Sequence, residues 1–381
     1  MPSSSIAPAL VGPQRLAGLD LPGLFAGLPD PRGPRGKRRL VAVALAVVLG
    51  VALAGAWSCA AIGRWVREAG LRTAGPLDWP ERLSEASAVR RVLAWIDADL
   101  FGDLLGAWAW LRVRSDPRKR TVISFGGKTA RGAKAGGGTA SRLLAGLVCG
   151  AGTVVAPTAV DAKTDEISCL QNLLKRLAVG GCLIVAGALR GQTAAGWAVL
   201  QRGADCLPTV KRGQPKLRQA CAGLPWRQVP AAWSAGRGRG RRRVWSIRVA
   251  AAGCWAGFSG VQQIAQLVRQ TVRGGEKTTD TVCLLCFLPV WRASPEQIAV
   301  WAQGRWAVES PRRIRDAVYG EDQSTVSAGF GPQTMATLRN LAVGLLRLSG
   351  RDGVAAWLRH HAWHPEDIPK LLLTSPEKTL P

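Results

Sequence analysis

Short apolar runs bounded by glycine constrain the fold of this chain more than any other feature of its sequence. Five of them are predicted as strands, at Thr121–Phe125, Leu143–Cys149, Thr153–Val160, Cys182–Val185 and Cys206–Val210. Apolar residues at helical spacing predict helices over Asp165–Leu177 and Thr193–Gln201. The order strand, strand, strand, helix, strand, helix, strand predicts an α/β domain, and by itself it allows several α/β arrangements.

A second informative stretch, Ala293–Leu348, opens with signals that start a helix. Ser294 suits the N-cap, Pro295 suits the first helical position, and Gln297 completes a capping box. Apolar residues then recur at helical spacing, at Ile298, Trp301, Ala302 and Trp306. A helix with one buried face is therefore expected to begin this stretch.

Three motifs follow in order: W-A-V-E from Trp306, R-D-A-V-Y-G-E-D from Arg315, and G-P-Q-T-M-A-T-L-R-N-L-A-V-G-L-L-R-L from Gly331. Together they resemble the C-terminal signature of the H-repeat-associated (ISAs-type) DDE transposase family. Further segments similar to the family are D-P-R at Asp30, G-K-R at Gly36 and W-S-C-A-A-I-G-R-W at Trp57. The resemblance implies a ribonuclease H-like arrangement for the α/β domain, with a β-rich insertion and a preceding all-helical N-terminal domain.

The family's reaction uses three carboxylates that hold two divalent ions, usually Mg²⁺. The resemblance places the third carboxylate at Glu309. Gly126 stands where the first aspartate is expected, in F-G-G-K-T-A-R-G, and Gly187 stands where the second is expected, in A-G-A-L-R-G-Q. Lys128 and Asp161 match the family nearby and are auxiliary candidates, although Asp161 could equally cap a helix.

No neighbouring carboxylate compensates for these glycines. Residues 121–160 and 171–204 contain neither Asp nor Glu. Pro311 follows Glu309 closely, and it removes a backbone N–H from the turn that carries the carboxylate. Glu309 is then the one metal ligand left, so productive Mg²⁺ binding is not expected and the enzyme is expected to be impaired.

The charge of the chain favours a polyanionic partner. The sequence has 51 Lys and Arg residues against 25 Asp and Glu residues, a formal net charge of +26. Such an excess binds phosphates by releasing counterions and carries no sequence specificity. Candidate DNA-binding residues are Lys211, Arg237, Arg239, Arg241, Arg242, Arg243 and Arg305. The run from Arg237 to Arg243 is interpreted as a basic hairpin, with a surface loop as the alternative.

An apolar run from Leu40 to Ala56 reaches the lower limit for crossing a bilayer, and basic residues precede it. It contains Gly50 and Gly55, and no second run of this quality follows. A buried helix is the preferred interpretation, while a membrane anchor formed by residues 40–56 stays open as an alternative.

The nine cysteines are scattered, and Cys283 and Cys286 form the one C-x-x-C motif. The three histidines all lie near the C-terminus, at His360, His361 and His364. This spacing does not favour a zinc site, so reduced thiols in a cytosolic protein are expected.

Together these patterns predict an irregular N-terminus at 1–25, a helical domain at 26–115, a ribonuclease H-like domain at 116–350 with an insertion at about 212–292, and a tail at 351–381. Three functions compete. They are a transposase-lineage protein that binds DNA with little or no activity, an active enzyme whose metal is held by Glu309 with Asp161 or other groups, and a basic membrane-associated protein. Within the first function, a non-catalytic regulator that binds insertion-sequence ends is a further alternative. The first implies double-stranded DNA as partner, a place on the bacterial nucleoid in the cytoplasm, and self-association as an open question.

Overall fold

The computed structural model describes most of the chain. The described residues are 16, 18–30, 40–56, 58–77, 86–113, 120–129, 142–160, 170–171, 174–186, 192–210, 213–238, 241–252, 260–307, 309–321, 324, 326, 328–351 and 353–373. The chain divides into two compact units. The first contains Met1–Pro117, Gly127–Thr164 and Glu309–Pro381, and the second contains Arg118–Gly126 and Asp165–Val308.

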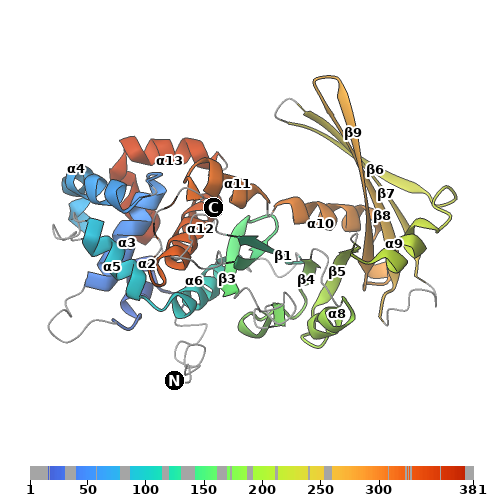
Figure 1. Ribbon diagram of the computed structural model, residues 1–381, viewed down its shortest axis with the longest axis horizontal. Helices are drawn as coiled ribbons and strands as arrows, with labels where there is room; N and C mark the ends of the chain where they lie inside the picture. Colours follow the sequence, from blue (N-terminus) through green and yellow to red (C-terminus); the bar gives the residue numbers. More distant parts are fainter. Residues whose placement is uncertain are drawn as a thin grey trace. The chain divides into compact units, whose positions relative to one another are not determined.

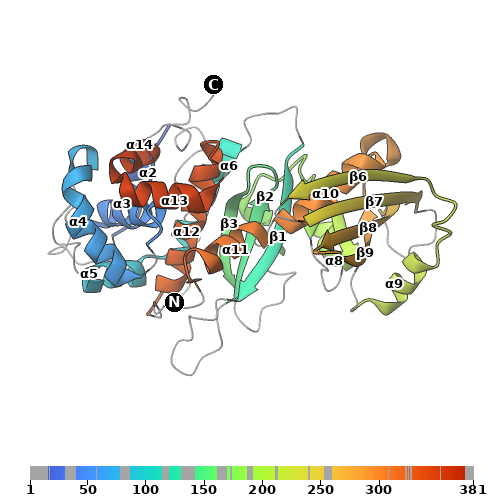
Figure 2. The same cartoon turned by 90° about the horizontal axis from the view of Figure 1, so that it is seen from above.

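Helices from both ends of the chain build the first unit (Figures 1 and 2). The N-terminal part contributes α2 (Leu21–Ala26), α3 (Leu40–Leu53), α4 (Cys59–Leu77), α5 (Ala86–Trp95) and α6 (Ala98–Val113). The C-terminal part contributes α11 (Glu309–Ala317), α12 (Gly331–Leu348), α13 (Val354–Trp363), η5 (Pro365–Asp367) and α14 (Ile368–Leu373). Strands β2 (Arg142–Val148) and β3 (Thr153–Val160) pair antiparallel in the same unit.

Helix α3 is the apolar run of the sequence, and it lies in the core of the first unit. Leu45, Leu49 and Leu53 are all fully buried. A helix that is apolar on every side must be covered on every side. Here α2, α4 and α5 from its own end of the chain and α12, α13 and α14 from the other end contact it. Among the described residues, no helix is both long and apolar enough to cross a membrane.

Helix α12 connects the helices of this unit to its strands. Both α12 and α6 pack against β3. Gly344 makes the close approach possible, because a Cβ at this position would lie 3.1 Å from Cγ2 of Thr153. Nearby, the guanidinium of Arg347 donates a hydrogen bond of 2.7 Å to the carbonyl of Gly152.

A buried group of charges holds α11, the turn after it and α12 together. One carboxylate oxygen of Glu321 lies 3.4 Å from Nε of Arg315, and the other lies 3.5 Å from Nη1 of Arg339. All three side chains are at most 7% exposed. Burial lowers the pKa of Arg339, whereas the charge of Glu321 raises it. Beside this group, the hydroxyl of Tyr319 donates a hydrogen bond of 2.9 Å to the carbonyl of Ala52 in α3.

Glu321→Gln should strongly destabilise the protein, because it removes the negative charge that lies beside two buried guanidinium groups. The expected loss is about 3–5 kcal/mol in the free energy of unfolding, measured by urea denaturation. Asp280→Asn, which breaks an ion pair at an exposed site, should cost no more than about 1 kcal/mol. Equal losses in the two variants would contradict a structural role for the buried charges.

His361 links α13 to the end of α3 in its neutral form. Its Nδ1 lies 3.2 Å from the carbonyl oxygen of Leu53, to which it can only donate. Its Nε2 lies 2.8 Å from Nη1 of Arg351, and because a guanidinium group can only donate hydrogen bonds, Nε2 is the acceptor. Burial is the main cause that lowers the pKa of His361, and Arg351 and His360 lower it further, while the Leu53 carbonyl and Asp367 oppose the shift.

The stability of the protein should therefore fall as the pH is lowered below about 6.5, the pKa of an unfolded histidine. In that range His361 binds a proton in the unfolded chain but stays neutral in the folded protein, so a lower pH favours unfolding. Thermal unfolding between pH 7.5 and 5 should show this decline. His361→Gln should weaken the dependence, and His364→Gln should leave it unchanged, because that side chain is 53% exposed.

The second unit is built on a mixed sheet whose strand order is β1-β4-β5-β9-β8-β7-β6. Its strands are β1 (Val122–Thr129), β4 (Leu183–Ala186), β5 (Asp205–Val210), β6 (Ala231–Gly238), β7 (Arg241–Ala251), β8 (Gln263–Arg273) and β9 (Glu276–Cys286). Strands β1, β4 and β5 run parallel to one another (Figure 1). The following neighbours in the sheet, β5 with β9, β9 with β8, β8 with β7 and β7 with β6, all pair antiparallel. Strand β1 is the strand at which the chain passes from the second unit to the first.

Four helical segments accompany this sheet: α8 (Gln192–Leu200), α9 (Pro215–Ala222), η3 (Val290–Arg292) and α10 (Pro295–Ala307). The predicted capping box begins α10. The backbone N–H of Gln297 donates to Oγ of Ser294 at 3.3 Å, and the N–H of Ser294 donates to Oε1 of Gln297 at 3.0 Å. Ile298 and Ala302 are buried, as their spacing predicts.

The five predicted strands are all present, with ends shifted by a few residues. Helix α4, in the predicted helical stretch 26–115, begins at Cys59. Ser58 is its N-cap, and its Oγ accepts a hydrogen bond of 3.1 Å from the N–H of Ala61. The helix predicted over Asp165–Leu177 lies largely outside the described residues, although Leu170, Leu174 and Leu177 are buried.

Candidate active site and nucleic-acid surface

The two expected aspartate positions come directly after the last paired residues of the parallel strands β1 and β4 in the second unit. Strand β1 pairs with β4 in register, and the last pair is Phe125 with Ala186. Gly126 comes directly after Phe125 and is half-buried within β1. Gly187 comes directly after Ala186 in the sequence and lies outside the described residues. In α/β sheets, ligands bind beyond the carboxyl ends of parallel strands, whereas β1 continues past Gly126 to Thr129.

The residues at this site do not fit a pair of divalent ions. Neither β1 (VISFGGKT) nor β4 (LIVA) carries a carboxylate, and glycine offers no side-chain oxygen. Mg²⁺ requires oxygen ligands, which carboxylates supply together with charge. Within the part of the chain that the structure describes, no group of three His, Cys, Asp or Glu side chains could hold a metal ion.

The other predicted catalytic residues are less fully described. Glu309 is the first residue of α11, in the first unit, and its side chain lies outside the described part, as does that of Lys128 in β1. Asp161 also lies outside it. Pro311 is the third residue of α11, where a backbone N–H has no partner within the helix, so the proline is accommodated there.

The basic run forms a hairpin, as predicted, but its arginines do not share one face. Strands β6 and β7 pair with Arg237 opposite Arg242, whereas Arg241 and Arg243 pair with glycines at 238 and 236. Opposite residues point to the same face of a sheet and successive residues to opposite faces. Arg242 is therefore on one face, and Arg241 and Arg243 are on the other. The sequence analysis grouped these arginines without regard to this alternation, although the two-residue period of a strand predicts it.

The remaining predicted DNA-binding residues cannot be placed in the same way. Lys211 and Arg239 lie outside the described residues. Arg237 is in β6 and Arg305 is in α10, but their side chains lie outside the described part.

The C-x-x-C motif does not act as a unit, because Cys283 and Cys286 lie on opposite faces of β9. Burial raises the pKa of Cys286 to about 11. Cys283 instead shares a hydrogen bond with Cys221 of α9, which together with the charge of Arg218 lowers its pKa. Both cysteines are free thiols, as are Cys286 and Cys206.

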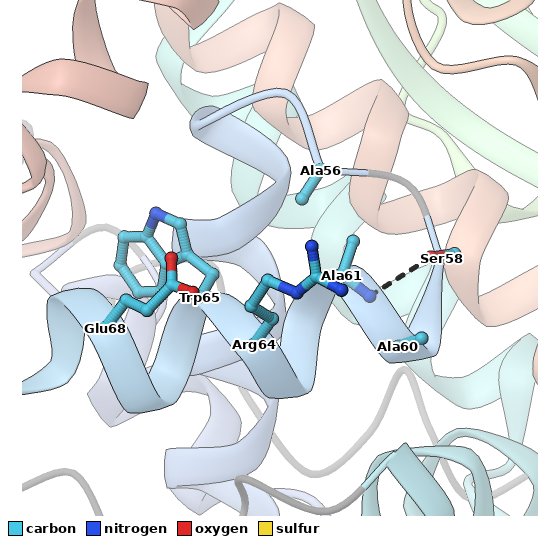
Figure 3. A pocket seen from close by; sticks show the side chains of 7 residues that line it. All are labelled: Ala56, Ser58, Ala60, Ala61, Arg64, Trp65 and Glu68. Atoms are coloured by element: carbon cyan, nitrogen blue, oxygen red, sulfur yellow. Dashed lines mark hydrogen bonds between the residues drawn. The ribbon is translucent and has the colours of Figure 1, made fainter.

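A hollow of about 380 Å³ lies at the start of α4 in the first unit (Figure 3). It is lined by Ala56, Ser58, Ala60, Ala61, Arg64, Trp65 and Glu68. Its charged groups are one guanidinium and one carboxylate, so it does not supply the acidic trio of a two-metal site. None of the predicted site residues line it.

Magnesium should therefore leave the unaltered protein unchanged and bind a variant in which both aspartates are restored. Adding Mg²⁺ at tenfold its dissociation constant to Gly126→Asp with Gly187→Asp should stabilise that variant by about 1.4 kcal/mol, a rise in melting temperature of ~2–4 °C. A control with the same added charge, Ser234→Asp with Thr279→Asp, should show no rise. A rise in the unaltered protein would show that other residues hold the metal.

Comparison with known proteins supports the resemblance in the N-terminal part of the chain. Residues 23–109 match the family model DDE_Tnp_1-associated. No curated protein matches the chain. Among solved structures, a piggyBac transposase synaptic complex with hairpin DNA is similar, with 9% identity and a TM-score of 0.43 over 99% of this chain and 87% of that one. A TM-score of this size does not establish a common fold.

Proposed function

We propose that this chain, whose residues 23–109 match the DDE_Tnp_1-associated family model, is a DNA-binding protein of DDE transposase descent that no longer cuts or joins strands. The observation that carries this proposal is the pairing of β1 with β4, since both strands lead into a glycine where the lineage needs an aspartate. Its partner is double-stranded DNA at the ends of an insertion sequence, on the nucleoid of a bacterial cytoplasm.

The strand order supports a ribonuclease H-like core. Along the chain β1 is followed by the antiparallel pair β2 and β3 and then by β4 and β5, and within the second unit β4 lies between β1 and β5 in the sheet. The pairing β1-β4-β5 is parallel, and β2 and β3 are antiparallel. This is the arrangement implied by the order of segments in the sequence. Strands β6 to β9 follow as the β-rich insertion.

The chemistry of strand transfer explains why activity is lost. Two divalent ions next to phosphate need several negative ligands in fixed positions. Glu309 alone supplies one carboxylate, and glycines at 126 and 187 supply none. Removing two carboxylates also removes their mutual repulsion in the absence of metal, so the fold does not depend on them.

The charge of the chain supports continued DNA binding. Its net charge of +26 remains although the acidic ligands are gone, and phosphate contacts need no metal. A basic protein that binds DNA without cleaving it suits a second candidate function. Such a protein would occupy insertion-sequence ends and so repress an intact transposase.

The decisive experiment restores Gly126→Asp and Gly187→Asp together and compares the variant with the unaltered chain. With Mg²⁺, the variant should cleave DNA that carries the element's ends, and the unaltered chain should bind it without cleavage. Adding Glu309→Gln should abolish the restored cleavage and leave binding intact. Cleavage by the unaltered chain would refute the loss of activity, and absence of binding would refute the DNA-binding role.

A further inference from the structure

The register of β6 to β9 assigns every described side chain of these strands to one of two faces. Residues directly opposite one another share a face, and the pairings run through all four strands without a bulge. Arg242 opposes Val272, which opposes Lys277, so Arg242 and Lys277 share a face. Trp233 opposes Ser246 and belongs to this face as well. We name it the acid-free face.

The acid-free face carries cations and no carboxylate. Arg242 and Lys277 are both exposed, and Trp233 is 64% exposed. The described β9 residues between Lys277 and the base of the sheet on this face are Thr279 and Thr281, both exposed hydroxyl side chains. A polyanion therefore meets attraction and hydrogen-bond donors here, without repulsion.

On the opposite face, which we name the paired face, acidic side chains neutralise part of the positive charge. Asp280 and Arg269 form an ion pair of 2.9 Å, and the guanidinium of Arg269 lies 5.6 Å from the ring centre of Trp245. Glu276 opposes Arg273 in the same register. Both acidic residues of these four strands are thus on the paired face, where they would repel phosphate.

We propose that DNA lies along the acid-free face, and that the arginines of the paired face, Arg241 and Arg243 included, do not contact it. This inference rests on the proposed DNA-binding function and specifies the surface. Arg242 and Lys277 are two strand spacings apart, about 10 Å. Phosphates on the two sides of a DNA groove are separated by a comparable distance, roughly 6–12 Å. The exposed ring of Trp233 adds an apolar surface for a sugar or base.

The test compares two variants that remove equal charge from adjacent positions. Arg242→Gln with Lys277→Gln alters the acid-free face, and Arg243→Gln with Arg273→Gln alters the paired face. Affinity for a 25-base-pair duplex is measured by fluorescence anisotropy from about 50 to 300 mM salt. The first variant should bind at least tenfold more weakly at low salt, and its salt slope should fall by about 1.8, for two phosphate contacts. The second variant should stay within twofold of the unaltered chain.

Equal weakening in both variants would overturn the inference, since it would show that net charge alone matters. Greater weakening in the paired-face variant would also overturn it. Failure of the unaltered chain to bind duplex DNA would instead refute the proposed function. Trp233→Ala provides an independent readout without a change in charge. It should weaken binding several-fold with an unchanged salt slope, whereas Trp363→Ala, at an exposed tryptophan of the first unit, should bind normally. Equal binding by these two tryptophan variants would exclude the acid-free face even if the charge variants unfold.

Discussion

Parallel pairing of β1 with β4 is the constraint on which the functional interpretation depends. Residues from distant parts of the chain, Phe125 and Ala186, become neighbours because their strands run side by side in the same direction. In a parallel sheet the carboxyl ends of such strands meet at one edge. That edge can collect two carboxylates into one site, and in this chain it collects none. Neither strand carries a carboxylate that could bind a divalent ion.

Strands β6 to β9 show how the alternation of side chains along a strand can separate neighbouring basic residues onto two faces. In the sequence, a run of arginines looks like one basic patch. Once it is a strand, each step along the chain turns the next side chain to the other face. The face of each charged residue is then set by its position along the strand, and both acidic residues of the four strands lie on the same face. The remaining face is positive because of the register, not because of its composition alone.

The first unit depends on burial of one apolar helix by both ends of the chain. Helix α3 has no polar side to present to water, so α12, α13 and α14 complete its cover. Polar links then set how these helices meet. Tyr319 and His361 both donate hydrogen bonds to carbonyls at the end of α3, and the charges around Glu321 join α11 to α12. A matched set of buried polar contacts gives this apolar core a specific arrangement.

The sequence by itself predicted strands β1 to β5, the capping box at Ser294, the lack of Asp and Glu from residues 121–160 and 171–204, and the basic charge. These are local properties, because periodicity, capping and composition act over a few residues. Only the tertiary structure decided that α3 is covered by the C-terminal helices, that Glu321 lies between Arg315 and Arg339, and that Arg242 and Lys277 share a face. Such contacts join residues far apart in the chain, and no local spacing encodes which distant partner a buried surface will meet.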